Sequence, residues 1–175
     1  MRLHTLGPEA TDSWKAAVFY RENNKDKADI EIIGHASFED ILENLADLAG
    51  DYLVIPAAFQ SQKMGLTWGD MHYLYQKQLG LKEAFVMNLN PMLLLENSYV
   101  HNHLAFTHAA VAKLLLQYVP EAEVVTCPSK YLAYQEYRRR GQYVLTNEQN
   151  VTLRPFEKVL ARIEIPMVWC IYQIK

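Results

Sequence analysis

The sequence lacks the cysteine patterns that bind metal or build a disulfide framework. Its two cysteines, Cys127 and Cys170, lie far apart, and neither belongs to a C-x-x-C pair. Isolated thiols of this kind pack like small apolar side chains, so we expect both to be free and buried. His101 and His103 are placed to share a strand face, but no third ligand follows at a suitable spacing. We therefore expect no metal site.

Long apolar runs are also missing. The longest candidate, from Pro91 to Leu95, is far shorter than the ~20 residues that cross a bilayer. The N-terminus, from Met1 to Glu9, has no apolar stretch followed by small residues, as a secretory signal would have. We expect a cytoplasmic protein with reduced thiols and no membrane partner.

An excess of positive charge is absent as well. The chain has 17 Lys and Arg against 20 Asp and Glu, a net charge of −3, which is not typical of a general nucleic-acid binder. Half of the residues are hydrophobic and 21% are charged, a balance that favours a folded protein over a disordered one. A length of 175 residues suits one well-filled folded unit, with room for two lobes.

The common catalytic fingerprints G-x-G-x-x-G, Walker A, G-x-S-x-G and H-E-x-x-H do not occur. Strand-like segments instead alternate with helical ones, which is typical of an α/β protein with a largely parallel sheet. Strands are expected at 2–6, 30–33, 52–55, 84–95 with a break at Asn90-Pro91, 104–107, 123–126, 143–145, 159–165 and 167–174. Helices are expected at 12–21, 38–48, 71–78, 109–118 and 130–140, with a helical turn at 147–153. Polar segments 23–29 and 60–69 are expected to be loops.

Three predicted strand ends carry polar residues. They are Thr5–Thr11 (TLGPEAT), Thr107-His108 and Thr146-Asn147. Backbone N–H groups at the start of a helix bind anions, and open α/β sheets bind ligands beyond the carboxyl ends of their strands. Each hydroxyl is equally suited to cap a helix. The residues alone leave both roles open.

The order of these motifs resembles the catalytic domain of prephenate dehydratases. Thr5–Thr11 resembles the G-P-x-G-T motif of that family, Val54–Pro56 its V-P element, and Phe106–His108 its S-H element. Leu145–Glu148 and Ile165–Trp169 resemble the L-T-N-E and I-P-M-x-W signatures of the small prephenate decarboxylases in bacilysin- and aeruginosin-type pathways. The resemblance extends from Thr5 to Tyr172.

The resemblance implies a two-lobed, periplasmic-binding-protein-like α/β fold with a cleft between the lobes. Lobe 1 is expected at about 1–65 plus 155–175 and lobe 2 at about 66–154, without a regulatory ACT domain. It further implies a small-molecule dicarboxylate substrate, no cofactor, no nucleic-acid partner and a homodimer.

Site residues follow from the same resemblance. Thr107 and His108 are expected to be catalytic, and His108 suits a general acid because the reference pKa of imidazole is ~6.5. The residues expected to bind substrate are Thr5, Gly7, Pro8, Glu9, Ala10, Thr11, Pro56, Thr107, Thr146, Asn147, Met167 and Trp169.

The chain departs from the dehydratase pattern at two places. Where dehydratases carry N-x-T-R-F, Val168 replaces the threonine that assists loss of the ring hydroxyl, and Trp169 replaces the arginine. Ala10 replaces the motif glycine. The resemblance therefore favours non-aromatising decarboxylation of prephenate to a dihydro-4-hydroxyphenylpyruvate, in the biosynthesis of a peptide antibiotic or similar metabolite. The alternatives are a prephenate dehydratase that makes phenylpyruvate, and a small-acid-binding module without catalysis.

Overall fold

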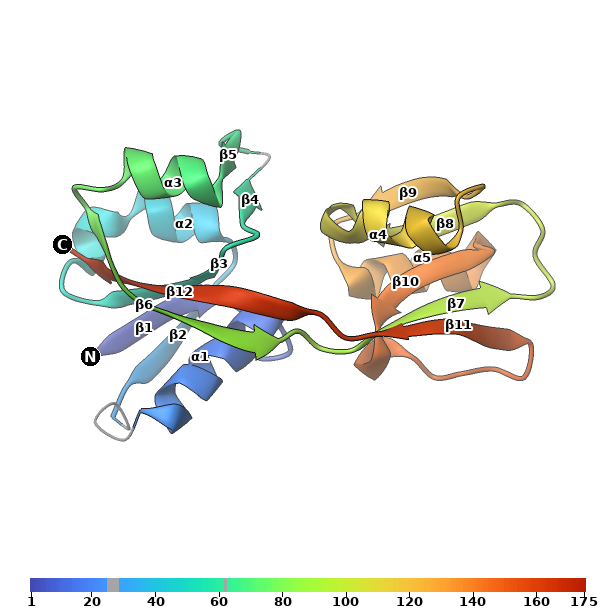
Figure 1. Ribbon diagram of the computed structural model, residues 1–175, viewed down its shortest axis with the longest axis horizontal. Coiled ribbons are helices and arrows are strands. Elements are labelled where there is room, and N and C mark those ends of the chain that lie inside the picture. Colours follow the sequence, from blue (N-terminus) through green and yellow to red (C-terminus); the bar gives the residue numbers. More distant parts are fainter. Residues whose placement is uncertain (25–28, 62) are drawn as a thin grey trace. The chain divides into compact units, whose positions relative to one another are not determined.

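The computed structural model describes residues 1–24, 29–61 and 63–175. Within them the chain forms two structural units (Figure 1). Unit 1 comprises Met1–Met87 and Pro166–Lys175, and unit 2 comprises Asn88–Ile165. Each unit contains a five-stranded mixed sheet with its own buried core.

The sheet of unit 1 has the strand order β2-β1-β3-β12-β6. Its members are β1 (Arg2–Leu6), β2 (Glu31–His35), β3 (Tyr52–Pro56), β6 (Leu79–Asn88) and β12 (Pro166–Ile174). β1 pairs in parallel with β2 and β3, whereas β12 is antiparallel to β3. Leu53, Val54 and Ile55 are completely buried, as the continuous apolar run of β3 predicts for a strand covered on both faces.

Helices α1 (Asp12–Asn23), α2 (Phe38–Glu43) and α3 (Trp68–Leu74) and the 3-10 helix η2 (Leu45–Leu48) complete unit 1. Ser37 caps α2, since its hydroxyl accepts a hydrogen bond from the backbone N–H of Asp40 at 3.1 Å. The single helix predicted over 38–48 is interrupted at Asn44. Its side chain donates to the Asp40 carbonyl at 2.7 Å, which competes with the helical backbone pattern.

The sheet of unit 2 has the strand order β11-β7-β10-β8-β9. Its members are β7 (Met92–Asn97), β8 (Leu104–His108), β9 (Glu123–Cys127), β10 (Tyr143–Asn147) and β11 (Glu157–Ile163). β8 is parallel to β9 and β10, and β7 is antiparallel to β10 and β11.

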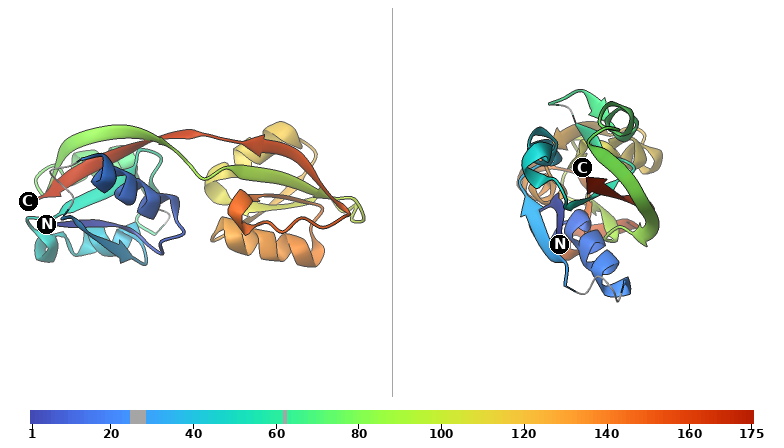
Figure 2. Two further views of the ribbon diagram at one scale, coloured as in Figure 1. Left: turned by 90° about the horizontal axis from the view of Figure 1, so that it is seen from below. Right: turned by 90° about the vertical axis from the view of Figure 1, so that its left-hand side faces the viewer.

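Helices cover both faces of this sheet. They are η3 (Ala109–Val111), α4 (Ala112–Tyr118), α5 (Lys130–Arg140) and η4 (Glu148–Asn150). One apolar core lies under α4 and contains Leu115, and the other lies under α5 and contains Tyr134 and Tyr137. Figure 2 shows α4 and α5 on opposite sides of the sheet.

The structure differs from the sequence-based expectation in the number of sheets and in the boundaries between the units. The chain forms two mixed sheets instead of one largely parallel sheet. The units change at 87/88 and 165/166, and not near 65/66 and 154/155. The reason is long-range pairing: β6 joins β12 in unit 1, and β11 joins β7 in unit 2.

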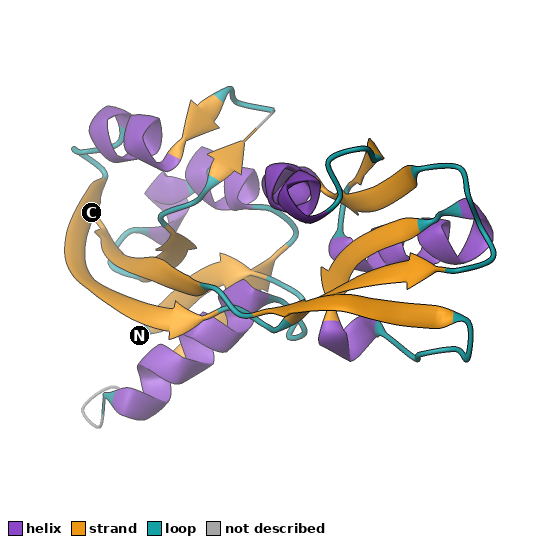
Figure 3. Ribbon diagram, turned by 45° about the vertical axis from the view of Figure 1, so that its right-hand side comes forward, coloured by secondary structure: helices purple, strands orange, loops and turns teal. Residues whose placement is uncertain are grey.

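Smaller differences concern loops and thiols. The predicted loop at 60–69 contains a short hairpin, β4 (Gln60–Ser61) and β5 (Leu66–Thr67), beside α3 (Figure 3). Residues 25–28 of the other predicted loop, and Gln62, lie outside the described part. Both cysteines are free, but only Cys170 is buried, because Cys127 ends the edge strand β9. No helix in the described residues is long and apolar enough to span a membrane.

Candidate functional site

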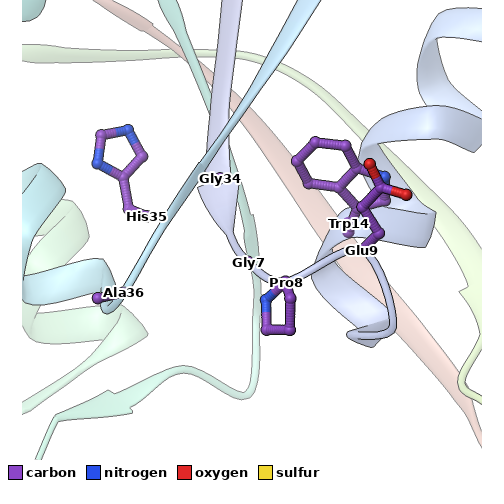
Figure 4. A pocket seen from close by; sticks show the side chains of 7 residues that line it. All are labelled: Gly7, Pro8, Glu9, Trp14, Gly34, His35 and Ala36. Carbon is purple, nitrogen blue, oxygen red and sulfur yellow. The ribbon is translucent and has the colours of Figure 1, made fainter.

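An open depression of about 520 Å³ lies at the carboxyl ends of β1 and β2 in unit 1 (Figure 4). It is lined by Gly7, Pro8, Glu9, Trp14, Gly34, His35 and Ala36. The carboxyl edge of parallel strands is where open α/β sheets bind ligands. The structure therefore places three residues of the predicted substrate set, Gly7, Pro8 and Glu9, at a pocket, and adds Trp14, Gly34, His35 and Ala36, which the sequence did not single out.

Two glycines bring β1 and β2 close together at the floor of this pocket. The backbone N–H of Gly7 donates to the His35 carbonyl at 2.9 Å. A Cβ atom on Gly34 would lie 3.2 Å from the Gly7 Cα and 3.1 Å from the Trp14 ring. A side chain at position 34 would therefore require the Trp14 ring and the Gly7 backbone to move by a few tenths of an ångström.

The threonines of the first junction are held by the backbone. Thr11 caps α1, since its Oγ1 accepts from the backbone N–H of Trp14 at 3.1 Å, and it donates to the Leu6 carbonyl at 2.9 Å. Thr5 is buried and donates to the Val54 carbonyl at 3.3 Å. Each hydroxyl has one proton to donate, and in Thr5 and in Thr11 that proton is donated to a backbone carbonyl. The sequence leaves open whether these hydroxyls bind a ligand or bond to the backbone. In the structure Thr11 caps α1 and Thr5 bonds to β3.

The second predicted cluster lies at the carboxyl edge of β8 and β10 in unit 2. Thr107 and Thr146 are fully buried. Thr107 Oγ1 donates to the Leu145 carbonyl at 2.8 Å, and Thr146 Oγ1 donates to the Lys130 carbonyl at 2.7 Å. These hydroxyls connect neighbouring elements of unit 2; the catalytic role of Thr107 and the binding of substrate by both threonines stay predictions.

His108 and Asn147 complete that edge. Nδ1 of His108 accepts from the backbone N–H of Ala110 at 3.3 Å and thereby caps η3. Burial lowers the pKa of His108, and the nearby Lys130 lowers it further. The imidazole is therefore largely neutral at pH 7, and its role as a general acid stays a prediction. Asn147 Oδ1 is buried and has no hydrogen-bond partner among the described residues.

Four further residues of the predicted substrate set lie outside the pocket. Trp169 is 1% exposed and stands opposite Pro56 in the β12–β3 pair, so its ring is buried in the core. Met167 and Pro56 are half-buried, and Ala10 is exposed in a turn before α1. None of these four lines the pocket.

A network of two histidines and an aspartate lies behind the pocket. Nε2 of His35 and Nδ1 of His4 are 2.8 Å apart, and Nε2 of His4 is 3.3 Å from Oδ2 of Asp51. The Arg2 guanidinium lies 2.6 Å from the same carboxylate oxygen, and the Arg2 backbone N–H donates to Oδ1 at 3.2 Å. No local sequence pattern points to this network, because His4 and Asp51 are 47 positions apart.

The electrostatics of this network differ from one end to the other. Burial alone would raise the pKa of Asp51, but hydrogen bonds from Arg2 and His4 outweigh it and hold the pKa below its usual value. At the other end, burial and the neighbouring His4 lower the pKa of His35, against a weaker opposite effect of Asp40. At neutral pH Asp51 is therefore ionised and His35 is neutral.

Metal binding finds no support in the described residues. No three His, Cys, Asp or Glu side chains gather closely enough there to hold an ion. The lining residues bring backbone groups, the Trp14 side chain and the Glu9 carboxylate to the depression, whereas the His35 imidazole lies on the other side of β2 from these two side chains (Figure 4). Such a set can bind a small organic molecule and exchange a proton with it.

Comparisons with known proteins define the class of fold. No protein-family model and no curated protein matches the chain. Among solved structures, the prephenate dehydratase from Staphylococcus aureus has a TM-score of 0.63 over 99% of the chain, at 14% identity. The prephenate dehydratase from Arthrobacter aurescens, solved with L-Phe, has a TM-score of 0.56 over 100% of the chain, at 14% identity. The periplasmic VFT2 domain of BvgS from Bordetella pertussis has 0.56 over 99%, at 15% identity, and the chain covers 80% of it.

The chain thus has the two-lobed α/β fold found in prephenate dehydratases and in periplasmic-binding-protein-like domains, which confirms the predicted fold class. It spans 66% of the S. aureus chain and 61% of the A. aurescens chain, less than two thirds of either. At 14% identity this likeness concerns the fold alone. The narrower resemblance to bacilysin-type decarboxylases stays a prediction from the sequence motifs.

Proposed function

We propose that this chain binds prephenate and removes its ring carboxylate without making the ring aromatic. Two facts support prephenate as the substrate. The fold is shared with two prephenate dehydratases, and the Gly7-Pro8 motif that resembles theirs lines a pocket at the carboxyl edge of β1. The two similar solved structures do not distinguish decarboxylation from dehydration, so the choice between these reactions rests on residues of this chain.

The observation that carries this choice is the start of β12. The dehydratases that the sequence resembles have a threonine and an arginine where this chain has Val168 and Trp169. Val168 is 43% exposed and has no proton to give, and Trp169 is buried in the core. Neither side chain can protonate a departing hydroxyl group or pair with a substrate carboxylate. The route that expels the hydroxyl is therefore disfavoured.

The remaining route keeps the hydroxyl group. The bond between the quaternary ring carbon and its carboxylate breaks, carbon dioxide leaves, and the electron pair moves through the ring diene. A distant ring carbon then takes a proton, and the ring stays non-aromatic. One proton is consumed, and the dianion becomes a monoanion. A proton donor beside the ring is thus the one catalytic group that the reaction requires.

Binding of a dianion in this pocket must rely on backbone groups. The lining residues include no Lys or Arg, and Glu9 adds a negative charge. Backbone N–H groups of a tight turn before a helix bind carboxylates without a cation. In the turn between β1 and α1 the N–H groups of Gly7 and Thr11 already donate to the His35 and Pro8 carbonyls, so a carboxylate bound there has to replace one of these bonds.

The test is to incubate the pure protein with prephenate in D₂O and to follow the products by NMR and ultraviolet spectra. We expect a non-aromatic, hydroxylated product that carries one deuterium on the ring. Phenylpyruvate would show a dehydratase, and binding without turnover would show a binding module. Either result would overturn the proposal.

A matched pair of variants tests whether the pocket is the site. Ala36 is exposed and lines the pocket, so Ala36→Trp should fill it and raise KM for prephenate at least tenfold. Ala84 is exposed on β6 in the same unit and serves as the control, since Ala84→Trp adds the same ring away from the pocket. Equal kinetics for the two variants would place the substrate elsewhere.

A further inference from the structure

Glu9 gives the depression of unit 1 a negative charge that nothing among its lining residues balances. No Lys or Arg lines the depression, and His35 is neutral at pH 7. Glu9 is exposed, and no hydrogen bond or ion pair joins its carboxylate to another described residue. Its oxygens can therefore accept hydrogen bonds from a ligand.

The Trp14 side chain lies on the same side of β2 as Glu9 (Figure 4). Its ring is held against that strand, since a Cβ atom on Gly34 would lie 3.1 Å from Cζ3 and 3.4 Å from Cε3 of the indole. Trp14 is half-buried and lines the depression, where an indole supplies a broad apolar surface. The depression thus offers a surface for an apolar ring and a negatively charged hydrogen-bond acceptor.

Prephenate has one group that matches this acceptor. Its ring hydroxyl donates a hydrogen bond, whereas its two carboxylates and its keto group only accept. The hydroxyl is on C4, across the ring from the quaternary carbon that carries both acidic substituents. A carboxylate attracts the hydroxyl proton and repels the two substrate carboxylates. Glu9 therefore favours the orientation in which the hydroxyl end of the substrate faces it.

We propose that Glu9 accepts a hydrogen bond from the C4 hydroxyl group of prephenate while the substrate ring lies against Trp14, and that this contact helps to determine the product. Prephenate as the ligand rests on the proposed function. The preference for a ring that carries a hydroxyl group rests on the lining residues alone.

The charge of Glu9 opposes loss of the hydroxyl group. When that group departs, the C4–O bond breaks and the oxygen keeps the electron pair, so negative charge develops on it. The Glu9 carboxylate has no proton to give to this oxygen, and its own charge destabilises the departing hydroxide. In the non-aromatising route the C4–O bond stays intact and the oxygen stays neutral. Glu9 therefore disfavours phenylpyruvate more than the non-aromatic product.

The first experiment compares two probes of equal charge. cis-4-Hydroxycyclohexanecarboxylate and cyclohexanecarboxylate differ by the ring hydroxyl alone, and calorimetry measures the Kd of each. The hydroxyl should lower Kd about tenfold in the unsubstituted protein, as expected for a hydrogen bond to a charged group. Glu9→Met removes the acceptor, so its two Kd values should agree within about twofold. Glu9→Gln keeps an acceptor oxygen and should give an intermediate ratio.

The control for these variants is Glu22→Met. Glu22 is exposed near the end of α1 and does not line the depression, so this variant should keep the tenfold ratio. Equal Kd values for the two probes in the unsubstituted protein would overturn the proposal. A tenfold ratio that persists in Glu9→Met, or failure of both probes to bind, would overturn it as well.

The second experiment measures the products from prephenate at pH 8, with a sample without protein as the background. Glu9→Gln should raise the share of phenylpyruvate at least ~10-fold, because its amide N–H can donate to the departing oxygen. Glu22→Gln changes the net charge equally and should leave the share unchanged. An unchanged share in Glu9→Gln would overturn the effect of Glu9 on the product.

The two experiments separate two failures. If the unsubstituted protein does not convert prephenate, the proposed function fails, and the two probes alone decide whether Glu9 binds a ring hydroxyl. If it converts prephenate and binds both probes equally, the assignment of Glu9 fails and the proposed function stands.

Discussion

Each unit of this protein has a polar edge at the carboxyl ends of parallel strands, but the two edges use their polar groups differently. At the β8–β10 edge of unit 2, Thr107, His108 and Thr146 are engaged with the backbone of unit 2 itself. At the β1–β2 edge of unit 1, glycines bring the strand ends together and His35 borders a pocket. Similar sequence signals thus serve stability in one unit and a candidate site in the other.

This difference has a physical origin in the donors. A threonine hydroxyl next to a strand end finds a carbonyl of the neighbouring element within reach, and burial then makes that bond obligatory. An imidazole has two nitrogens, so a histidine that is bonded through one of them still has the other. This holds for His35, which bonds to His4, and equally for His108, whose Nδ1 accepts from the backbone N–H of Ala110.

The largest effect is expected in unit 2. Thr107→Val keeps the shape of the side chain but removes its bond to the buried Leu145 carbonyl, which should lower the free energy of unfolding by about 1–2 kcal/mol. Thr126 pairs with Thr107 across β8 and β9 and is exposed, so Thr126→Val is a matched control and should stay within ~0.5 kcal/mol. Urea unfolding measures both. Equal stability of the two variants would contradict the structural role of Thr107.

A smaller effect is expected in the pocket of unit 1. Glu9→Gln removes a negative charge from the lining without changing its shape, so KM for prephenate should fall by about three- to tenfold at low salt, and less at high salt. Glu22 lies exposed near the end of α1, and Glu22→Gln is the control for the change in net charge. An unchanged KM in Glu9→Gln would show that the carboxylates of prephenate bind outside this pocket.

The smallest effect is expected from pH and compares the units directly. Burial lowers the pKa of both His35 and His108, so the unfolded chain binds more protons than the folded chain below pH ~6.5. Their contribution is fully present above that pH and is lost as pH falls through it. Urea midpoints should therefore decrease from pH 7.5 to pH 5.5.

His35→Gln and His108→Gln should each weaken this pH dependence, and His101→Gln serves as the control. A midpoint that increases toward pH 5.5 would contradict the sign. A pH dependence that disappears in one variant alone would assign the effect to a single unit.

Much of the local structure could be predicted from the sequence. β1 lies at the predicted residues, the strand cores of β3, β8 and β9 follow from short apolar runs, and Ser37 and Ser129 cap α2 and α5 at the predicted helix starts. These features depend on neighbours within a few residues, which the sequence displays directly.

The candidate site could be predicted only in part. The Gly7-Pro8 turn was found, because it is a contiguous motif at the end of a strand. Gly34, His35 and Asp51 were missed, because no local pattern distinguishes them from other turn and surface residues. The burial of Trp169 could not be predicted, because a strand residue faces the core or the solvent according to a register that is set by its partner β3.

The sequence by itself determined the α/β class, the position of most elements and the turn that borders the pocket, since these follow from local periodicity and capping. Only the tertiary structure decided that β6 joins β12 and β11 joins β7, which divides the chain into its two units. It also decided that His4 meets His35, 31 positions away, and Asp51, 47 positions away. Parallel pairing of β1 with β2 and β3 brings these three side chains together, and contacts across such distances depend on the packing of the whole sheet.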